Sequence, residues 1–151
     1  MNPPTDFPRR RANGSLLVAY IDTPDGHDAL QLGIALARER QVNLKIVSVI
    51  PPVTPQGFGV QTQDPGYNAI VREQTEQRLA SALNNLPADI SATWHVVEGT
   101  EPALALNDAA QKLECDLIVV GARPGGLLNR FRIGTVPSSL LYTAQTPVAL
   151  A

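Results

Sequence analysis

The stretch SLLVAYIDTPDGHDALQLGIALARERQVNLKIVSVI, residues 15–50, decides the fold. Its first part, Ser15 to Ile21, is a continuous apolar run with β-branched and aromatic members, which suits a strand buried on both faces. After a turn cluster, apolar residues recur at helical spacing from His27 to Arg40. Asn43 to Ile50 is again apolar and stops at two prolines, which cannot continue a central strand. The stretch therefore predicts a strand, a crossover helix and a second, parallel strand.

The rest of the chain continues the alternation of apolar runs and helical stripes. The elements expected downstream are a long loop over Pro51–Tyr67, a helix over Tyr67–Leu86, a strand over Ile90–Val97, a helix that follows an N-cap at Thr100, a strand over Asp116–Val120, a helix over Val136–Thr143 and a strand over Pro147–Ala151. This order predicts the α/β class, with a doubly wound, Rossmann-like sheet of five parallel strands and about four helices.

The first 14 residues differ in composition from the remainder. They contain three prolines and the run Arg9 to Arg11, with almost nothing to bury, so they cannot offset the entropy of becoming ordered. We expect a disordered tail over 1–14 and one α/β domain over 15–151. The arginines also invite comparison with a twin-arginine export signal, but Asp22 interrupts the apolar stretch that such a signal needs. A solvated tail is favoured, with contact to anionic lipid or a partner as the alternative.

Charge and composition exclude several functional classes. Twelve basic and 14 acidic residues disfavour a general nucleic-acid binder. One cysteine and two histidines supply neither a disulfide framework nor a structural zinc site, so no metal ligands are assigned. The longest apolar runs, Leu16–Ile21 and Leu117–Val120, fall far short of the roughly 20 residues that span a bilayer. We expect a cytoplasmic protein that does not span a membrane.

The carboxyl ends of the strands hold the residues suited to a ligand, since open parallel sheets bind ligands where the strand order reverses. The first strand leads to Asp22 and the second to Val49, while the fourth leads into a glycine-rich segment, 121–135. That segment carries three arginines, Arg123 among them, and no acid. Glycines allow backbone N–H groups to approach an anion, and a helix that follows an N-cap at Thr135 adds aligned donors. The pattern indicates a phosphate site.

The glycine spacing fits neither a Walker loop nor the dinucleotide motif, which follows the first strand. It resembles the signature of the universal stress protein family: Gly, two residues, Gly, nine residues, then Gly and Ser or Thr. The likeness extends over Ser15 to Ala151. The stretches that carry it are YID, VSVIPP, EGTEPALALNDAAQKLECDLIVVGARPGG and RIGTVPSSLLYTAQTPVALA.

The resemblance implies an adenine-nucleotide site. Pro124 stands where the nucleotide-binding members have glycine, and because proline lacks an N–H, Gly125 and Gly126 are expected to supply donors through a one-residue shift. The ligand implied is ATP or AMP, with or without Mg²⁺. The residues expected to hold it are Asp22, Val49, Gly121, Arg123, Gly125, Gly134 and Thr135.

Three functions remain open at this point. The first is a stress or signalling module that binds an adenine nucleotide and has no catalytic residues, or at most hydrolyses ATP slowly. The second is a nucleotide-free interaction domain that regulates a transporter or another protein partner. The third, an adenylyl-transferring enzyme, needs a histidine-rich motif that His27 alone does not supply. For the first two we expect a homodimer, because Pro147 to Ala151 should form an edge strand and family members commonly pair their last strands, which would bring Val148 and Leu150 against their counterparts.

The remaining reactive side chains have simple structural interpretations. His27 is expected to be an exposed residue of a first helical turn, and His95 a residue of a sheet surface or edge. Cys115 is interpreted as a small buried hydrophobe rather than a redox thiol.

Overall fold

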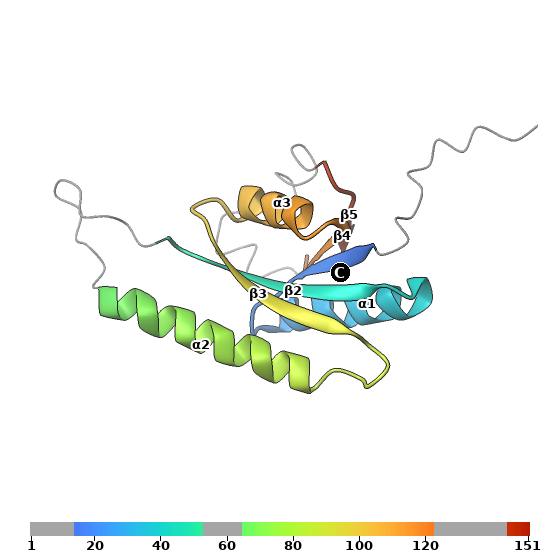
Figure 1. Ribbon diagram of the computed structural model, residues 1–151, viewed down its shortest axis with the longest axis horizontal. Coiled ribbons are helices and arrows are strands. Elements are labelled where there is room, and N and C mark those ends of the chain that lie inside the picture. Colours follow the sequence, from blue (N-terminus) through green and yellow to red (C-terminus); the bar gives the residue numbers. More distant parts are fainter. Residues whose placement is uncertain (1–13, 53–64, 123–144) are drawn as a thin grey trace, which may run out of the picture.

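The computed structural model describes residues 14–52, 65–122 and 145–151 of the chain. Three helices alternate with five strands in these ranges (Figure 1). In chain order the elements are β1 Ser15–Ala19, α1 Pro24–Arg40, β2 Asn43–Ile50, α2 Pro65–Asn84, β3 Ala92–Glu98, α3 Pro102–Lys112, β4 Cys115–Val120 and β5 Val148–Leu150.

The five strands form one parallel sheet in the order β3-β2-β1-β4-β5. Central β1 pairs on both sides, so that Val18 lies opposite Ile46 of β2 and Val119 of β4. The chain winds outward from β1 to β3 and then crosses back to β4, which places the reversal of strand order between β1 and β4. The doubly wound parallel sheet expected from the sequence is confirmed.

Helices cover both faces of the sheet, with α1 and α2 on one side and α3 on the other (Figure 1). The alternation of side chains along β1 divides the core accordingly. Leu16 and Val18 pack in the cluster beneath α1 and α2, whereas Leu17 packs in the cluster beneath α3. All three side chains are at most 1% exposed, as a strand buried on both faces requires.

Helix α1 begins earlier than expected, because the residues before His27 that were interpreted as a turn cluster form its N-cap and first turn. Thr23 is the N-cap, and its side chain accepts a hydrogen bond from the Gly26 N–H at 3.3 Å. Pro24 occupies the first helical turn, where its missing N–H costs nothing. The helix therefore begins at Pro24, three residues before His27, and its first turn lies directly after β1.

The remaining boundaries shift by one to two residues, as helix and strand ends commonly do. The second helix is Pro65–Asn84 instead of Tyr67–Leu86, and the third strand begins at Ala92. The expectation of a cap at Thr100 was wrong: the N-cap of α3 is Glu101, which forms no side-chain capping bond. The tail, most of the long loop, and the helix over 136–143 lie outside the described residues.

No helix within the described ranges is long and apolar enough to cross a membrane.

His95 lies on the edge strand β3, as expected, and its Nε2 is 2.9 Å from the Thr93 hydroxyl. Partial burial lowers the pKa of His95, and the positive charge of Lys45 on the neighbouring strand adds to this effect. Protonation therefore favours the unfolded chain, so the stability due to neutral His95 is present above its unfolded pKa and is lost as the pH falls through the folded pKa. We expect the free energy of unfolding to fall less steeply between about pH 7 and pH 5 in His95→Gln than in the unmodified protein. Urea titrations across this range test the expectation, and equal slopes would contradict it.

Candidate functional site

The carboxyl ends of β1 and β2 are joined by a buried hydrogen bond. The Ser48 hydroxyl donates to the Tyr20 carbonyl at 2.6 Å, and the Tyr20 N–H donates to the Val47 carbonyl at 2.8 Å. A buried carbonyl needs such a partner, and a serine placed between apolar residues in a strand provides it. These bonds hold the chain at Tyr20, where it leaves the sheet after β1, and so fix the position of Asp22.

Two adjoining cavities open at this end of the sheet. The smaller, of about 70 Å³, lies between the ends of β1 and β2 and residues Thr75 and Arg78 of α2. The larger, of about 620 Å³, is lined by residues of α1 and α2 and continues as far as Pro87. Tyr20, Asp22 and Arg78 line both cavities, so the two adjoin at these side chains.

Two of the residues expected to bind a ligand are brought together here, because Asp22 and Val49 line the smaller cavity. Gly121 lies at the end of β4, where it meets the first turn of α1. A Cβ atom at Gly121 would overlap the Asp25 carbonyl and lie 2.6 Å from the Asp25 Cγ. Only glycine fits this position without displacing α1. The other expected ligand residues, Arg123, Gly125, Gly134 and Thr135, lie outside the described residues.

Asp22 contacts a side chain that the sequence had not linked to it. The His27 Nε2 lies 3.0 Å from one carboxylate oxygen, Asp22 Oδ1, and both side chains are about half exposed. The His27 ring also meets the Tyr20 ring edge-on, with centroids 5.5 Å apart. His27 is exposed, as expected, yet it lines the larger cavity, because α1 begins early enough to bring its first turn back over Asp22.

Tyr20 is a polar residue that was missed as part of the site because it lies in an apolar run. It is 4% exposed, and its hydroxyl has no hydrogen-bond partner in the part of the chain that the structure describes. Burial and then the charge of Asp22 raise the pKa of the phenol, while Arg78 acts in the opposite direction. The hydroxyl stays protonated at neutral pH and is available as a donor at the junction of the two cavities.

Arg78 and Asp25 are the other residues that sequence reasoning missed. Arg78 is an exposed residue of α2 that also lines both cavities. Asp25 was taken as part of a turn, but it is 4% exposed beside Gly121. Within the described ranges, no group of three or more histidine, cysteine or acidic side chains is arranged to hold a metal ion.

A parallel, doubly wound domain with a cavity at the carboxyl ends of its strands is the class of protein that fold and site together define. The model of the universal stress protein family matches residues 13–151. The chain belongs to the universal stress protein family.

Known relatives agree with this assignment. A universal stress protein of Synechocystis is 28% identical over 151 residues, with 91% of this chain and 96% of the relative covered. One of Mycobacterium tuberculosis is 23% identical over 138 residues, and there the chain spans only about half (47%) of the relative's length. A solved family member from Burkholderia pseudomallei superposes with a TM-score of 0.72 at 24% identity, over 91% of this chain and 95% of the other.

Proposed function

We propose that this chain is a regulatory domain that binds an adenine nucleotide at the carboxyl ends of β1, β2 and β4. The observation that carries the proposal is the meeting of Asp22 and Val49 in one cavity, although they come from different strands. Gly121, which begins the glycine-rich segment, follows the strand on the other side of β1. A ligand that spans these three ends crosses the place where strand order reverses.

The phosphate groups are assigned to residues 121–135. Their composition supports this, because Arg123 supplies positive charge, Gly125 and Gly134 permit close approach to the backbone, and Thr135 precedes the expected helix. Asp22 and Val49 are assigned to the remainder of the nucleotide.

Family members of similar fold support the choice of ligand. Universal stress proteins have been solved with cAMP, with dAMP in the protein from Archaeoglobus fulgidus, and with AMP in the protein from Arabidopsis thaliana. We propose ATP or AMP for this chain, with Mg²⁺ accompanying ATP. The proposed role is a cytoplasmic stress or signalling module in which the nucleotide alters a protein-binding surface, with at most slow ATP hydrolysis.

Calorimetric titration with AMP and with ATP and Mg²⁺ tests this function. We expect Gly134→Asp to weaken binding at least tenfold, since a carboxylate placed at the phosphate site opposes the ligand by charge and bulk. Pro124→Gly, which restores an N–H, should tighten binding.

Asn43→Asp is the matched control, because it adds the same charge at the exposed start of β2, at the amino ends of the parallel strands. It should leave the affinity unchanged. If neither the unmodified protein nor Pro124→Gly binds at millimolar nucleotide, the nucleotide-free interaction domain takes the place of this function.

We further propose that the domain is a homodimer joined through β5. This three-residue strand lies at one edge of the sheet, and Leu150 is 49% exposed on it. An exposed strand edge carries unpaired backbone groups, and a two-fold axis would let two such edges pair.

We expect Leu150→Lys to convert a dimer to a monomer in light scattering, because two lysines would face each other across the axis. Leu104→Lys is the matched control, since Leu104 is equally exposed (48%) but lies on α3. A monomeric unmodified protein at tens of micromolar would exclude this assembly.

A further inference from the structure

We propose that the outer edge of β3 is a contact surface for a second copy of this chain, in which two β3 strands pair in antiparallel fashion about a two-fold axis beside His95. The contact lies at the edge of the sheet opposite to β5 and does not depend on nucleotide binding. Three observations carry it: the length of the exposed edge, the direction of its backbone groups and the symmetry of its side chains.

The first step concerns the exposed edge. Strand β3 has seven residues and is outermost on its side of the sheet, whereas β5 at the other edge has three. Helix α2 packs on the face of β3, and no element that the structure describes lies beyond it in the plane of the sheet (Figure 1). Natural sheets commonly protect such an edge with a lysine, a proline or a bulge. The sequence ATWHVVE has neither lysine nor proline, and its register with β2 is continuous, so β3 has none of these protections.

The second step concerns the backbone groups. At the two ends of the ladder between β2 and β3, the Leu44 N–H donates to the Ser91 carbonyl and the Gly99 N–H donates to the Ile50 carbonyl. Because alternate residues of a parallel ladder direct both backbone groups to the same side, the odd-numbered residues of β3 bond to β2. The residues that direct their N–H and C=O outward are Ala92, Trp94, Val96 and Glu98. These outward groups form no hydrogen bond with any residue that the structure describes.

The third step concerns symmetry. In an antiparallel pair, opposite residues that face each other exchange both of their backbone bonds. Full overlap of two β3 strands places Trp94 opposite Val96 of the second copy, and Ala92 opposite its Glu98, so every outward group finds a partner. Trp94 and Val96 are partly buried beneath α2, and an aromatic residue beside a β-branched one is a favourable cross-strand pair. The edge is therefore complementary to itself, as a two-fold contact requires.

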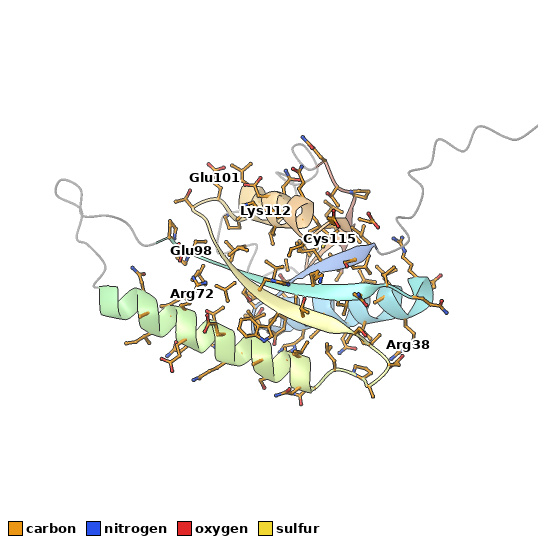
Figure 2. All side chains as sticks on the ribbon, viewed as in Figure 1. Arg38, Arg72, Glu98, Glu101, Lys112 and Cys115 are labelled. Atoms are coloured by element: carbon orange, nitrogen blue, oxygen red, sulfur yellow. The ribbon has the colours of Figure 1, made fainter. Side chains whose placement is uncertain are left out.

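The ends of the paired strands add no unpaired charge. Glu98 is held by Arg72 of α2, with Arg72 Nη1 3.0 Å from Glu98 Oε1 (Figure 2). The residue that it would meet in the second copy, Ala92, is uncharged. Pairing of the two edges therefore places no isolated carboxylate against another.

The fourth step concerns His95, which is the middle residue of β3 and so lies opposite its own counterpart. Because its backbone bonds to β2, the two histidines form the closer type of antiparallel pair, with Cα atoms about 4.5 Å apart. Two neutral imidazoles can lie side by side there, whereas two imidazolium ions repel each other.

The charge of His95 makes the contact sensitive to pH. Partial burial and then Lys45 of β2 lower the pKa of His95, while Asp108 and Lys112 of α3, the helix over this face, are exposed and do not shift it. The contact therefore forms at neutral pH and is lost as the pH falls through the His95 pKa, which lies below the usual value of about 6.5.

Sedimentation equilibrium of the Leu150→Lys chain isolates this contact, because the lysine blocks the β5 edge. Between 10 μM and 1 mM at pH 7.5 we expect monomers and dimers with a Kd on the order of 0.3 mM, since one strand edge buries less surface than a stable interface. Trp94 is the only tryptophan of the chain, so its emission should shift over the same concentrations. At pH 5.5 the association should weaken at least tenfold. Non-specific association would instead strengthen there, because the isoelectric point is about 5.6.

Val96→Pro tests the backbone ladder, because it removes one outward N–H and leaves the bonds to β2 in place. It should weaken association at least tenfold, whereas the control Val96→Thr keeps the N–H and should associate as before. His95→Lys should abolish association at both pH values, and His95→Gln should associate equally at both. Leu104→Lys, which adds the same charge on α3, is the control for His95→Lys and should change nothing.

The inference fails if the Leu150→Lys chain stays monomeric at 1 mM, if Val96→Pro or His95→Lys associates as strongly as that chain, or if association strengthens at pH 5.5. Thermal melts by circular dichroism establish that each variant is folded, and His95→Lys carries the test if Val96→Pro proves unstable. Nucleotide titration of the unmodified protein and of Gly134→Asp tests the proposed function separately, so either idea can fail without the other.

Discussion

Replacing Gly26 by alanine is expected to reduce the free energy of unfolding by about 3 kcal/mol or more, at the upper end of the overpacking range. A Cβ atom at this position would overlap the Ile21 carbonyl oxygen and lie 2.7 Å from the Ile21 nitrogen. These are backbone atoms at the end of β1 and cannot rotate away. Helix propensity alone would favour alanine by about 1 kcal/mol, so the steric effect has the opposite sign to what local sequence predicts.

Gly33→Ala provides the comparison, since it adds the same methyl group to the same helix. There the added Cβ meets a side-chain methyl group, Val18 Cγ2, which can shift where a carbonyl cannot. We expect a smaller loss, about 1–2 kcal/mol, because Val18 is fully buried and its neighbours must adjust. Urea denaturation measures both variants. A Gly26→Ala protein as stable as the unmodified one would show that α1 can move away from β1.

The second large effect concerns Cys115, which we expect to be nearly unreactive in the folded protein. It lies at the start of β4 against α3, 7% exposed (Figure 2). Burial raises the pKa of its thiol from 9.0 to about 12, with smaller and opposing effects from Lys45 and Asp116. The thiolate is the reactive form, so its fraction at neutral pH falls about a thousandfold.

Reaction with an aromatic disulfide reagent, followed by absorbance, measures this difference. We expect the folded protein to react at least a thousandfold more slowly than the same protein in denaturant, because burial limits access as well as ionisation. The rate that remains reports local opening around α3 and β4. Comparable rates in the two states would contradict the buried interpretation of Cys115.

The fold was predictable because its periodicities are strong. The run that becomes β1 is apolar on both faces and is buried on both, and the stripe of Leu30, Ile34 and Ala37 in α1 is the buried one. In the sequence of β3, Trp94 and Val96 alternate with Thr93 and His95, and Trp94 and Val96 pack against the cluster under α1 and α2. Each of these apolar patterns marks the residues that are buried in the structure, so the patterns were sufficient to predict the elements and their order.

The helix starts were less predictable because the same residues serve turns and caps. The sequence Asp-Thr-Pro-Asp-Gly is typical of a turn, but in the structure Thr23 caps a helix whose first residue is Pro24. Before α3, both Thr100 and Glu101 precede Pro102, and a threonine is the usual cap. The chain uses Glu101, and local sequence contains nothing that selects between the two.

The lining of the candidate cavity was predictable only where it follows strand ends. Asp22 and Val49 come from neighbouring strands, and topology alone brings them into one cavity. Arg78 reaches the same cavity from a helix that is remote in sequence, and its side chain has the charge of an ordinary solvated residue. Tyr20 was hidden in a run of buried residues. Contacts of this kind depend on how a helix lies across the sheet, which a period in the sequence does not specify.

The pairing of β5 has a practical consequence for reporters attached to this chain. The Ala151 N–H donates to the Val120 carbonyl, and the Ala122 N–H donates to the Ala151 carbonyl, so the last residue is held beside Gly121. Gly14 precedes β1, and because all strands are parallel it lies at their amino ends, opposite the carboxyl ends where the ligand is proposed to bind. A fluorescent protein fused before Gly14 would leave the ligand edge open, whereas one fused after Ala151 would emerge next to it. The second fusion would hinder ligand binding, or its fluorescence would change when the ligand binds.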